Sequence, residues 1–332
     1  MKKRILTGDT PTGKLHLGHY VGTLENRIKL QDEYETFIIL ANVHSFTTNY
    51  RDPQKIRRDT LDVALDNLAV GLDPKKATLF VESEVPEILE LHTYFEMLVK
   101  HARALRNPTV KDEIRAKGLE KQISVGLISY PILQAADILS FRAHLVPVGE
   151  DQAPHLEQTK EIARDFNKLY GEVFPIPEPL VGKVGRLPGT DGKEKMSKSL
   201  GNAILLSDPP EIVRKKVMKM YTDPTRIHST DPGHVEGNPV FIYHEAFNPN
   251  KNEVEDLKNR YRKGEVGDVE VKEKLVTVLN EFLEPIRRRR AGFTTRPGLV
   301  DDIIKKGSER ARKEAAETLK LVKKAMGLDY FG

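Results

Sequence analysis

Two absences narrow the class of protein that this sequence encodes. It contains no cysteine, which excludes disulfide bonds and thiolate metal sites. It also has no apolar run near the ~20 residues that a membrane-spanning helix needs. The basic start at residues 1–4 leads straight into a predicted core strand and not into an apolar signal segment. We therefore expect a cytoplasmic protein that does not associate with membranes.

The net charge is also small. The chain has 53 lysines and arginines against 49 acidic residues, which gives +4 at pH 7. Affinity for an acidic partner must therefore come from local clusters of basic residues. The sequence shows neither a fixed-period repeat nor a low-complexity tract. With 332 residues, of which 39% are hydrophobic, it is long enough for one large domain and a smaller one.

The first turn, at residues 10–22, is the most informative part of the sequence. A short apolar strand is predicted before it, and apolar residues recur at helical spacing after it. Such a turn leaves the first N–H groups of the helix unpaired beside the positive end of its dipole, where a phosphate binds. His16 and His19 share one face, and Gly18 between them lets a flat base approach the backbone. The pattern fits a nucleotide site or an ordinary α/β turn.

Two other interpretations of this turn are weaker. Residues 8–14 match the phosphate-binding pattern G-x-x-x-x-G-K, but Leu15 stands where that motif needs Ser or Thr to hold magnesium. A zinc site on His16 and His19 lacks further ligands, because the chain has no cysteine and no His-Glu-x-x-His sequence.

Strands and helices alternate over the first half of the chain. The sequence predicts buried strands at 36–42, 77–81 and 145–148, and helices at 52–70 and 154–170. This alternation is typical of a parallel, doubly wound sheet, whose ligands bind beyond the carboxyl ends of the strands. His44 and residues 149–152 follow two of the strands, which places them at that edge. For His44, a structural role and a role in binding both stay open.

Residues 87–139 are predicted to be mostly helical, with breaks at 107–108 and near Gly118. The stretch 108–122 carries four basic side chains and little apolar content, which indicates a mobile basic loop. The stretch 175–188 is also predicted to be rich in loops.

Three polar residues, Tyr130, Gln134 and Asp137, fall on one helical stripe in an otherwise apolar stretch. A carboxylate at such a place is costly unless something donates a hydrogen bond to it. Either Asp137 is paired within the protein, or it receives an N–H or O–H from a ligand.

A second short motif, K-M-S-K-S, occupies residues 195–199 and follows a Gly-rich segment at 189–194. Two lysines on a flexible segment can close on a polyphosphate and neutralise the charge that develops during its transfer.

Together these two motifs carry a family resemblance. Residues 16–19, His-Leu-Gly-His, resemble the HIGH motif of the class I aminoacyl-tRNA synthetases, and residues 195–199 match their KMSKS motif. Chain length, spacing and the stretch 136–157 most resemble tryptophanyl-tRNA synthetases of the bacterial type, over essentially the whole chain. The resemblance implies an α/β fold, in which a Rossmann-like doubly wound parallel sheet is followed by a C-terminal all-helical domain. It also implies that ATP with Mg²⁺ activates L-tryptophan, that the product passes to tRNA(Trp), and that the enzyme is a homodimer.

The resemblance also assigns roles to individual residues. It implies no metal-binding side chain and no general base, since the substrate's own carboxylate attacks the α-phosphate. Asp137 would accept the indole N–H, Tyr130 and Gln152 would take the α-amino group, and Gln134 and His44 would complete the tryptophan site. The catalytic residues would be His16, His19, Lys195 and Lys198, and the ATP-binding residues Thr10, Thr12, Gly18, Lys111, Gly149, Asp151, Met196 and Ser197.

Domain limits follow from the same resemblance. A catalytic domain would span 1–202, with dimer-interface helices at about 86–140 and a final helix at about 300–327 packing back onto it. A helical domain that binds the tRNA anticodon would span 203–299. We expect helices at about 240–247, 253–263, 269–290 and 297–326.

The basic residues of the C-terminal third permit two interpretations, contacts to tRNA phosphates or an ordinary charged helix surface. They are Arg287–Arg290, Arg296, Lys305 and Lys306. The apolar stripe of the last helix is predicted to lie in the core, and it comprises Ala311, Ala315, Leu319, Val322 and Met326.

Three alternative functions stay open. The stripe of Tyr130, Gln134 and Asp137 also resembles the tyrosine pocket of tyrosyl-tRNA synthetases. Nucleotidyltransferases for small cofactors also use a His-x-Gly-His turn. An auxiliary paralogue would bind RNA or a protein partner without catalysis.

Overall fold

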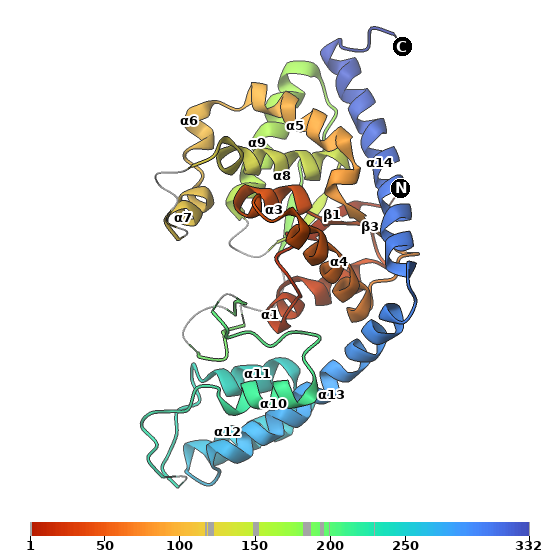
Figure 1. Ribbon diagram of the computed structural model, residues 1–332. Coiled ribbons are helices and arrows are strands. Elements are labelled where there is room, and N and C mark those ends of the chain that lie inside the picture. The colour runs from red at the N-terminus through yellow and green to blue at the C-terminus, as the bar shows by residue number, and fades with distance from the viewer. Residues whose placement is uncertain are drawn as a thin grey trace. The chain divides into compact units, whose positions relative to one another are not determined.

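The computed structural model describes residues 2–116, 118, 123–148, 153–181, 187–192, 196–198, 200–228 and 230–331. The chain divides into two compact units (Figure 1). The first, called the sheet unit, comprises residues 1–13, 26–182 and 296–332. The second, called the helical unit, comprises residues 14–25 and 183–295.

The sheet unit is built on five parallel strands in the order β3-β2-β1-β4-β5. Their bounds are β1 Arg4–Asp9, β2 Glu35–Leu40, β3 Ala77–Val81, β4 Leu145–Val148 and β5 Glu178–Val181. The order reverses at the β1/β4 pair, which is where doubly wound sheets place their ligand site. The predicted fold class is therefore confirmed.

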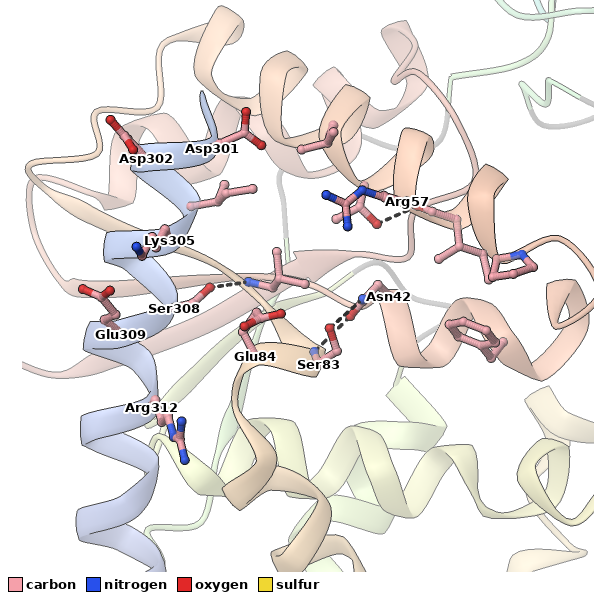
Figure 2. A pocket seen from close by; sticks show the side chains of 17 residues that line it. Asn42, Arg57, Ser83, Glu84, Asp301, Asp302, Lys305, Ser308, Glu309 and Arg312 are labelled. Carbon is pink, nitrogen blue, oxygen red and sulfur yellow. Dashed lines mark hydrogen bonds between the residues drawn. The ribbon is translucent and has the colours of Figure 1, made fainter. Parts of the chain in front are cut away.

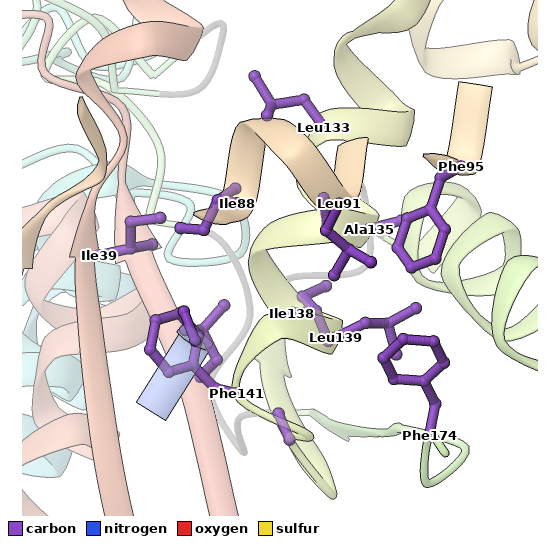
Figure 3. Close-up of a cluster of buried hydrophobic side chains, with 14 of the residues drawn as sticks. Ile39, Ile88, Leu91, Phe95, Leu133, Ala135, Ile138, Leu139, Phe141 and Phe174 are labelled. Carbon is purple, nitrogen blue, oxygen red and sulfur yellow. The ribbon is translucent and has the colours of Figure 1, made fainter. Parts of the chain in front are cut away.

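Helices cover the sheet because both of its faces are apolar. They are α3 Asn42–Asn49, α4 Pro53–Val70, α5 Pro86–Leu98, α6 His101–Ala104, α8 Val125–Ser140 and α9 Ala153–Tyr170, with the short 3-10 helix η2 at Glu82–Glu84. Asp52 caps α4 by accepting a hydrogen bond from Lys55 N at 2.9 Å. Aromatic and aliphatic side chains of α5 and α8, among them Phe95 and Leu139, pack into one buried cluster that positions α8 (Figure 3).

One local prediction was wrong and another was incomplete. Residues 108–116 are not a loop but the helix α7 Pro108–Ala116, because Asn107 Oδ1 accepts from Thr109 N at 3.1 Å and Val110 is buried. Of the remaining residues of that predicted loop, Gly118 lies in a turn, and 117 and 119–122 lie outside the described part. The stretch 175–188 contains β5, a four-residue strand at the edge of the sheet. An edge strand has only one neighbouring strand, so it tolerates Pro179, which has no N–H to donate to a second one.

The last helix, α14 Leu299–Met326, belongs to the sheet unit and packs against β3. Val81 N donates a hydrogen bond to Ser308 Oγ at 3.1 Å. Gly307 permits the close approach, since a Cβ on it would lie 1.9 Å from Leu79 O. The core prediction for this helix is confirmed, because Ala311, Ala315, Leu319 and Val322 are buried and Met326 packs against the same cluster.

The helical unit contains α1 Leu17–His19, the π-helical turn η1 Tyr20–Leu24, α10 Pro210–Met218, α11 Pro239–Phe247, α12 Lys251–Arg262 and α13 Asp268–Thr294. α2 Glu25–Leu30 continues from η1, so the helix predicted after the first turn is interrupted by a π-helical turn. The helices predicted in the C-terminal third are confirmed to within a few residues. Among the helices of the described residues, none is both long and apolar enough to span a membrane.

The contact between α14 and β3 gives the first prediction. Gly307→Ala forces a methyl group into the backbone of Leu79, so we expect it to lower the free energy of unfolding by about 1–3 kcal/mol in urea titrations. Gly292→Ala is the matched control, because this glycine of α13 has open space around it. We expect that change to be neutral or to stabilise by about 0.5–1 kcal/mol. Equal effects of the two changes would contradict the close packing.

Candidate functional site

Helix α8 presents the three predicted polar residues on one face. Ser124 Oγ caps the helix by accepting from Leu127 N at 3.1 Å, and the neighbouring apolar residues pack into the core. Asp137 is only 3% exposed, while Tyr130 and Gln134 are half-buried. The structure therefore confirms the polar stripe that the spacing predicted, and Asp137 is its most buried member.

Asp137 combines the two roles that its sequence position left open. Its Oδ2 lies 2.9 Å from His44 Nε2, which comes from α3. Its other oxygen, Oδ1, is buried and has no hydrogen-bond partner in the described part of the chain. Burial raises the pKa of the Asp137 carboxyl well above its usual range. One oxygen is thus paired within the protein, and the other is suited to receive a hydrogen bond from a ligand.

Glu82, which the sequence analysis did not single out, completes this cluster. It lies in η2 directly after β3 and is fully buried. Its Oε2 accepts from the backbone N–H groups of Val43 at 2.8 Å and His44 at 3.3 Å. Burial and, next, the nearby Asp137 raise the pKa of Glu82 to about 8. The available sequence signal was an acidic residue at the carboxyl end of a buried strand.

His44, Glu82 and Asp137 each offer one possible ligand atom, and these three atoms lie within 4.8 Å of one another, which is close enough to hold a metal ion. The 2.9 Å separation of His44 Nε2 and Asp137 Oδ2 is, however, a hydrogen-bond distance. Two ligands of a tetrahedral zinc, each about 2.0–2.1 Å from the ion, stand wider apart than that. The arrangement is therefore one of shared protons, and we assign no metal to it.

Tyr130 is held by a second buried network. Its Oη lies 3.2 Å from His155 Nε2, and Asn107 Nδ2 lies 3.2 Å from His155 Nδ1. Asn107 is a donor at this position, so the ring proton sits on Nε2 and is donated to Tyr130 Oη. A hydrogen bond to Glu113 of α7 adds to this, and burial with Glu113 raises the pKa of Tyr130. The sequence analysis did not identify Asn107 as part of the site, because its partner His155 lies 48 positions away.

In the helical unit, the first turn is fixed by pairing with a distant segment. Leu17 N donates to Ile204 O and Leu206 N donates to Leu15 O, both at 3.0 Å. His16 N donates to His19 Nδ1 at 3.2 Å, and the two rings lie 3.8 Å apart between centroids. Burial, followed by the charges of His19 and Lys198, lowers the pKa of His16 to about 3. His16 is therefore a neutral imidazole at physiological pH.

The two sequence motifs meet in this unit. Gly18 N lies 3.3 Å from Met196 Sδ, a contact in which the amide donates. A Cβ on Gly18 would lie 3.0 Å from the ring of His16 and 3.4 Å from Met196, so glycine is needed for the close fit. Ser197 N donates to Asn202 Oδ1 at 2.7 Å, which ties the second motif to the segment that follows it. Residues 178 positions apart thus form one cluster.

The structure does not gather every predicted site residue in one place. Thr10, Thr12 and Lys111 are exposed residues of the sheet unit. Lys195, Gly149, Asp151 and Gln152 lie outside the described residues.

A groove of about 500 Å³ on the sheet unit lies between α14, α4, α3 and η2 (Figure 2). Asn42 Nδ2 donates to Ser83 Oγ at 2.9 Å on its wall. Among the residues that the structure describes, none of those predicted to bind ATP or tryptophan lines it. Its charged residues carry both signs and select no ligand class: Arg57, Lys305 and Arg312 stand with Glu84, Asp301, Asp302 and Glu309.

Comparison with known proteins relates this arrangement to a family. Residues 1–284 match the family model of the class I tRNA synthetases (W and Y). The tryptophan–tRNA ligase of Clostridium longisporum is 52% identical over 335 residues, covering 99% of this chain and 98% of that protein. The tryptophan–tRNA ligase of Treponema pallidum is 52% identical over 327 residues, covering 98% and 97%.

A solved structure gives the same relation. The tryptophanyl-tRNA synthetase of Campylobacter jejuni, in complex with ADP and tryptophan, matches with a TM-score of 0.87 and 33% identity, covering 98% of this chain and all of that one. The chain therefore belongs to the class I aminoacyl-tRNA synthetases and, within them, to the tryptophan–tRNA ligase family.

Proposed function

We propose that this chain activates L-tryptophan with ATP, forming tryptophanyl-adenylate and pyrophosphate, and transfers the amino acid to tRNA(Trp). The proposal rests on Asp137 Oδ1, a buried acceptor on the largely apolar helix α8. The described part of the chain supplies no hydrogen-bond partner for it. The indole N–H of tryptophan is a donor and nothing else, so it matches this oxygen. The relatives named tryptophan–tRNA ligases support tryptophan over the tyrosine and cofactor alternatives.

The amino-acid site would then be assembled on the sheet unit. Asp137 accepts the indole N–H while His44 holds the carboxyl in place. Tyr130, oriented by His155, accepts from the α-amino group together with Gln152, and Gln134 completes the site. A rival side chain without the N–H would leave Asp137 Oδ1 buried and unpaired, which costs binding free energy.

The ATP-binding residues would act by position and charge. We propose that His16, Gly18 and His19 hold the adenosine and its phosphates, since the neutral His16 offers a hydrogen bond without adding charge. Lys195 and Lys198 stabilise the charge of the departing pyrophosphate, and the substrate carboxylate attacks in line without a general base. The further ATP contacts are Thr10, Thr12, Lys111, Gly149, Asp151, Met196 and Ser197. Mg²⁺ accompanies the phosphates of ATP, and no side chain is assigned to it.

The remaining assignments concern assembly and RNA. We propose a cytoplasmic homodimer with helices at 86–140 at its interface. We also propose that the helices at 203–299 bind the tRNA anticodon and that basic residues such as Arg288, whose side chain is 78% exposed, meet tRNA phosphates.

The tryptophan site is tested by Asp137→Ala. Loss of a buried acceptor is expected to raise the KM for tryptophan about 10–100-fold in ATP–pyrophosphate exchange while the KM for ATP stays within about 2-fold. Circular dichroism checks that the variant is folded. An unchanged KM for tryptophan in a folded variant would reject Asp137 as the indole acceptor.

The neutral state of His16 gives a pH dependence. Its pKa in the folded chain, about 3, is below the ordinary 6.5, so the unfolded chain binds more protons between these values. The stabilisation from this histidine is therefore complete above pH 6.5 and is lost as the pH falls toward 3. Relative to His16→Gln, which cannot titrate, the wild type should lose free energy of unfolding between pH 7 and 4 in urea titrations. A constant difference over that range would show that His16 is not buried in its neutral form.

A further inference from the structure

Glu82 has no role in the function proposed above, yet it is fully buried beside the residues that serve it. Burying a carboxyl group costs free energy unless it makes hydrogen bonds that compensate for its lost hydration. Its Oε2 makes two, to Val43 N at 2.8 Å and His44 N at 3.3 Å. The question is what these bonds achieve.

Both bonds go to the first turn of α3. Ala41 precedes this helix as its N-cap and makes no side-chain hydrogen bond to it. The first N–H groups of a helix need acceptors from outside. Glu82 therefore supplies, from the end of β3, the cap that the sequence of α3 lacks.

The capped turn carries His44, whose ring reaches Asp137 on α8. His44 Nε2 lies 2.9 Å from Asp137 Oδ2 and 3.6 Å from Glu82 Oε1. The ring of Tyr130 meets that of His44 edge to face, with centroids 6.2 Å apart. Capping by Glu82 Oε2 on one side and ring contact with Tyr130 on the other thus hold the imidazole with its Nε2 nearer to Asp137 Oδ2 than to Glu82 Oε1.

We propose that Glu82 is a positioning residue for tryptophan recognition: by capping α3 it holds His44 Nε2 against Asp137 Oδ2 and leaves Oδ1 as the oxygen of Asp137 that receives the indole N–H. This inference rests on the function proposed above and deepens it. Without the cap, the imidazole is free to turn toward Oδ1 or away from the carboxyl group, and the site no longer offers a single fixed acceptor.

The positioning role of Glu82 can be measured by how strongly the enzyme prefers tryptophan to an analogue of the same shape that lacks the indole N–H. In 3-(3-benzothienyl)alanine a sulfur atom replaces the indole N–H, so the analogue fills the same volume without donating to Asp137. A site built around one buried acceptor prefers tryptophan, because the analogue leaves that acceptor unpaired. A loss of stability alone lowers activity with both substrates and leaves the ratio of their kcat/KM values unchanged.

The experiment compares Glu82→Ala, Glu82→Gln and Glu84→Ala in ATP–pyrophosphate exchange with tryptophan and with the analogue. We expect Glu82→Ala to raise the KM for tryptophan about 10-fold, to leave the KM for ATP within about 2-fold, and to shrink the kcat/KM ratio between the two substrates by a similar factor. Glu82→Gln should keep the ratio within about 3-fold of wild type, because its amide oxygen accepts the same backbone N–H groups. Glu84→Ala is the matched control, an exposed acidic residue of the same short helix, and should behave as wild type.

Two results would overturn the inference: a wild-type ratio in Glu82→Ala, or a ratio in Glu82→Gln as low as in Glu82→Ala. If Glu82→Ala does not fold, the comparison of Glu82→Gln with wild type decides, since a reduced ratio there contradicts capping by an oxygen acceptor and a retained ratio supports it. Absence of tryptophan-dependent exchange in the wild type would instead refute the proposed function itself, so the two failures are distinguishable.

Discussion

The hydrogen bond between His44 and Asp137 is the interaction on which the rest of the amino-acid site depends. Three elements from distant parts of the chain contribute to it, since α3 carries the imidazole, α8 carries the carboxyl group and η2 carries Glu82. All three side chains are almost completely withdrawn from water. Such a cluster is stable only where each polar atom has a partner or a ligand supplies one. Two carboxyl oxygens of this cluster, Asp137 Oδ1 and Glu82 Oε1, have no hydrogen-bond partner in the described part of the chain. Asp137 Oδ1 belongs to the polar stripe of α8 and is therefore the acceptor that we assign to the ligand.

A second constraint operates in the helical unit. There the first turn is tied to residues 204–206 by backbone hydrogen bonds, and Gly18 packs closely against His16 and Met196. His16 stays neutral because burial disfavours its charged form and, next, because protonation would place a charge near His19 and Lys198. Each unit thus holds one half of the predicted chemistry on a rigid local frame, the amino-acid residues on the sheet unit and the two short motifs in the helical unit.

The sequence predicted what depends on periodicity and on short motifs. The parallel sheet follows from apolar runs that alternate with helices along the chain, and the α8 stripe with Asp137 and the apolar face of α14 follow from spacings of three to four residues. Features set by few residues or by distant partners were missed. β5 has four residues and a proline, and α7 depends on a cap from Asn107. The place of Glu82 at the carboxyl end of a buried strand was its one sequence signal, and its role depends on hydrogen bonds to Val43 and His44, which lie 39 and 38 positions away. The sequence also did not predict that the helix after residue 16 contains a π-helical segment.

The central claim is that a buried acceptor on α8 selects tryptophan for activation by ATP. The most direct measurement is ATP–pyrophosphate exchange by the wild-type protein with each of the twenty amino acids supplied separately. Our account predicts exchange with tryptophan alone, since it brings an indole N–H to Asp137 Oδ1. Exchange with tyrosine in place of tryptophan would make the Tyr130, Gln134 and Asp137 stripe a phenol site and would contradict the account.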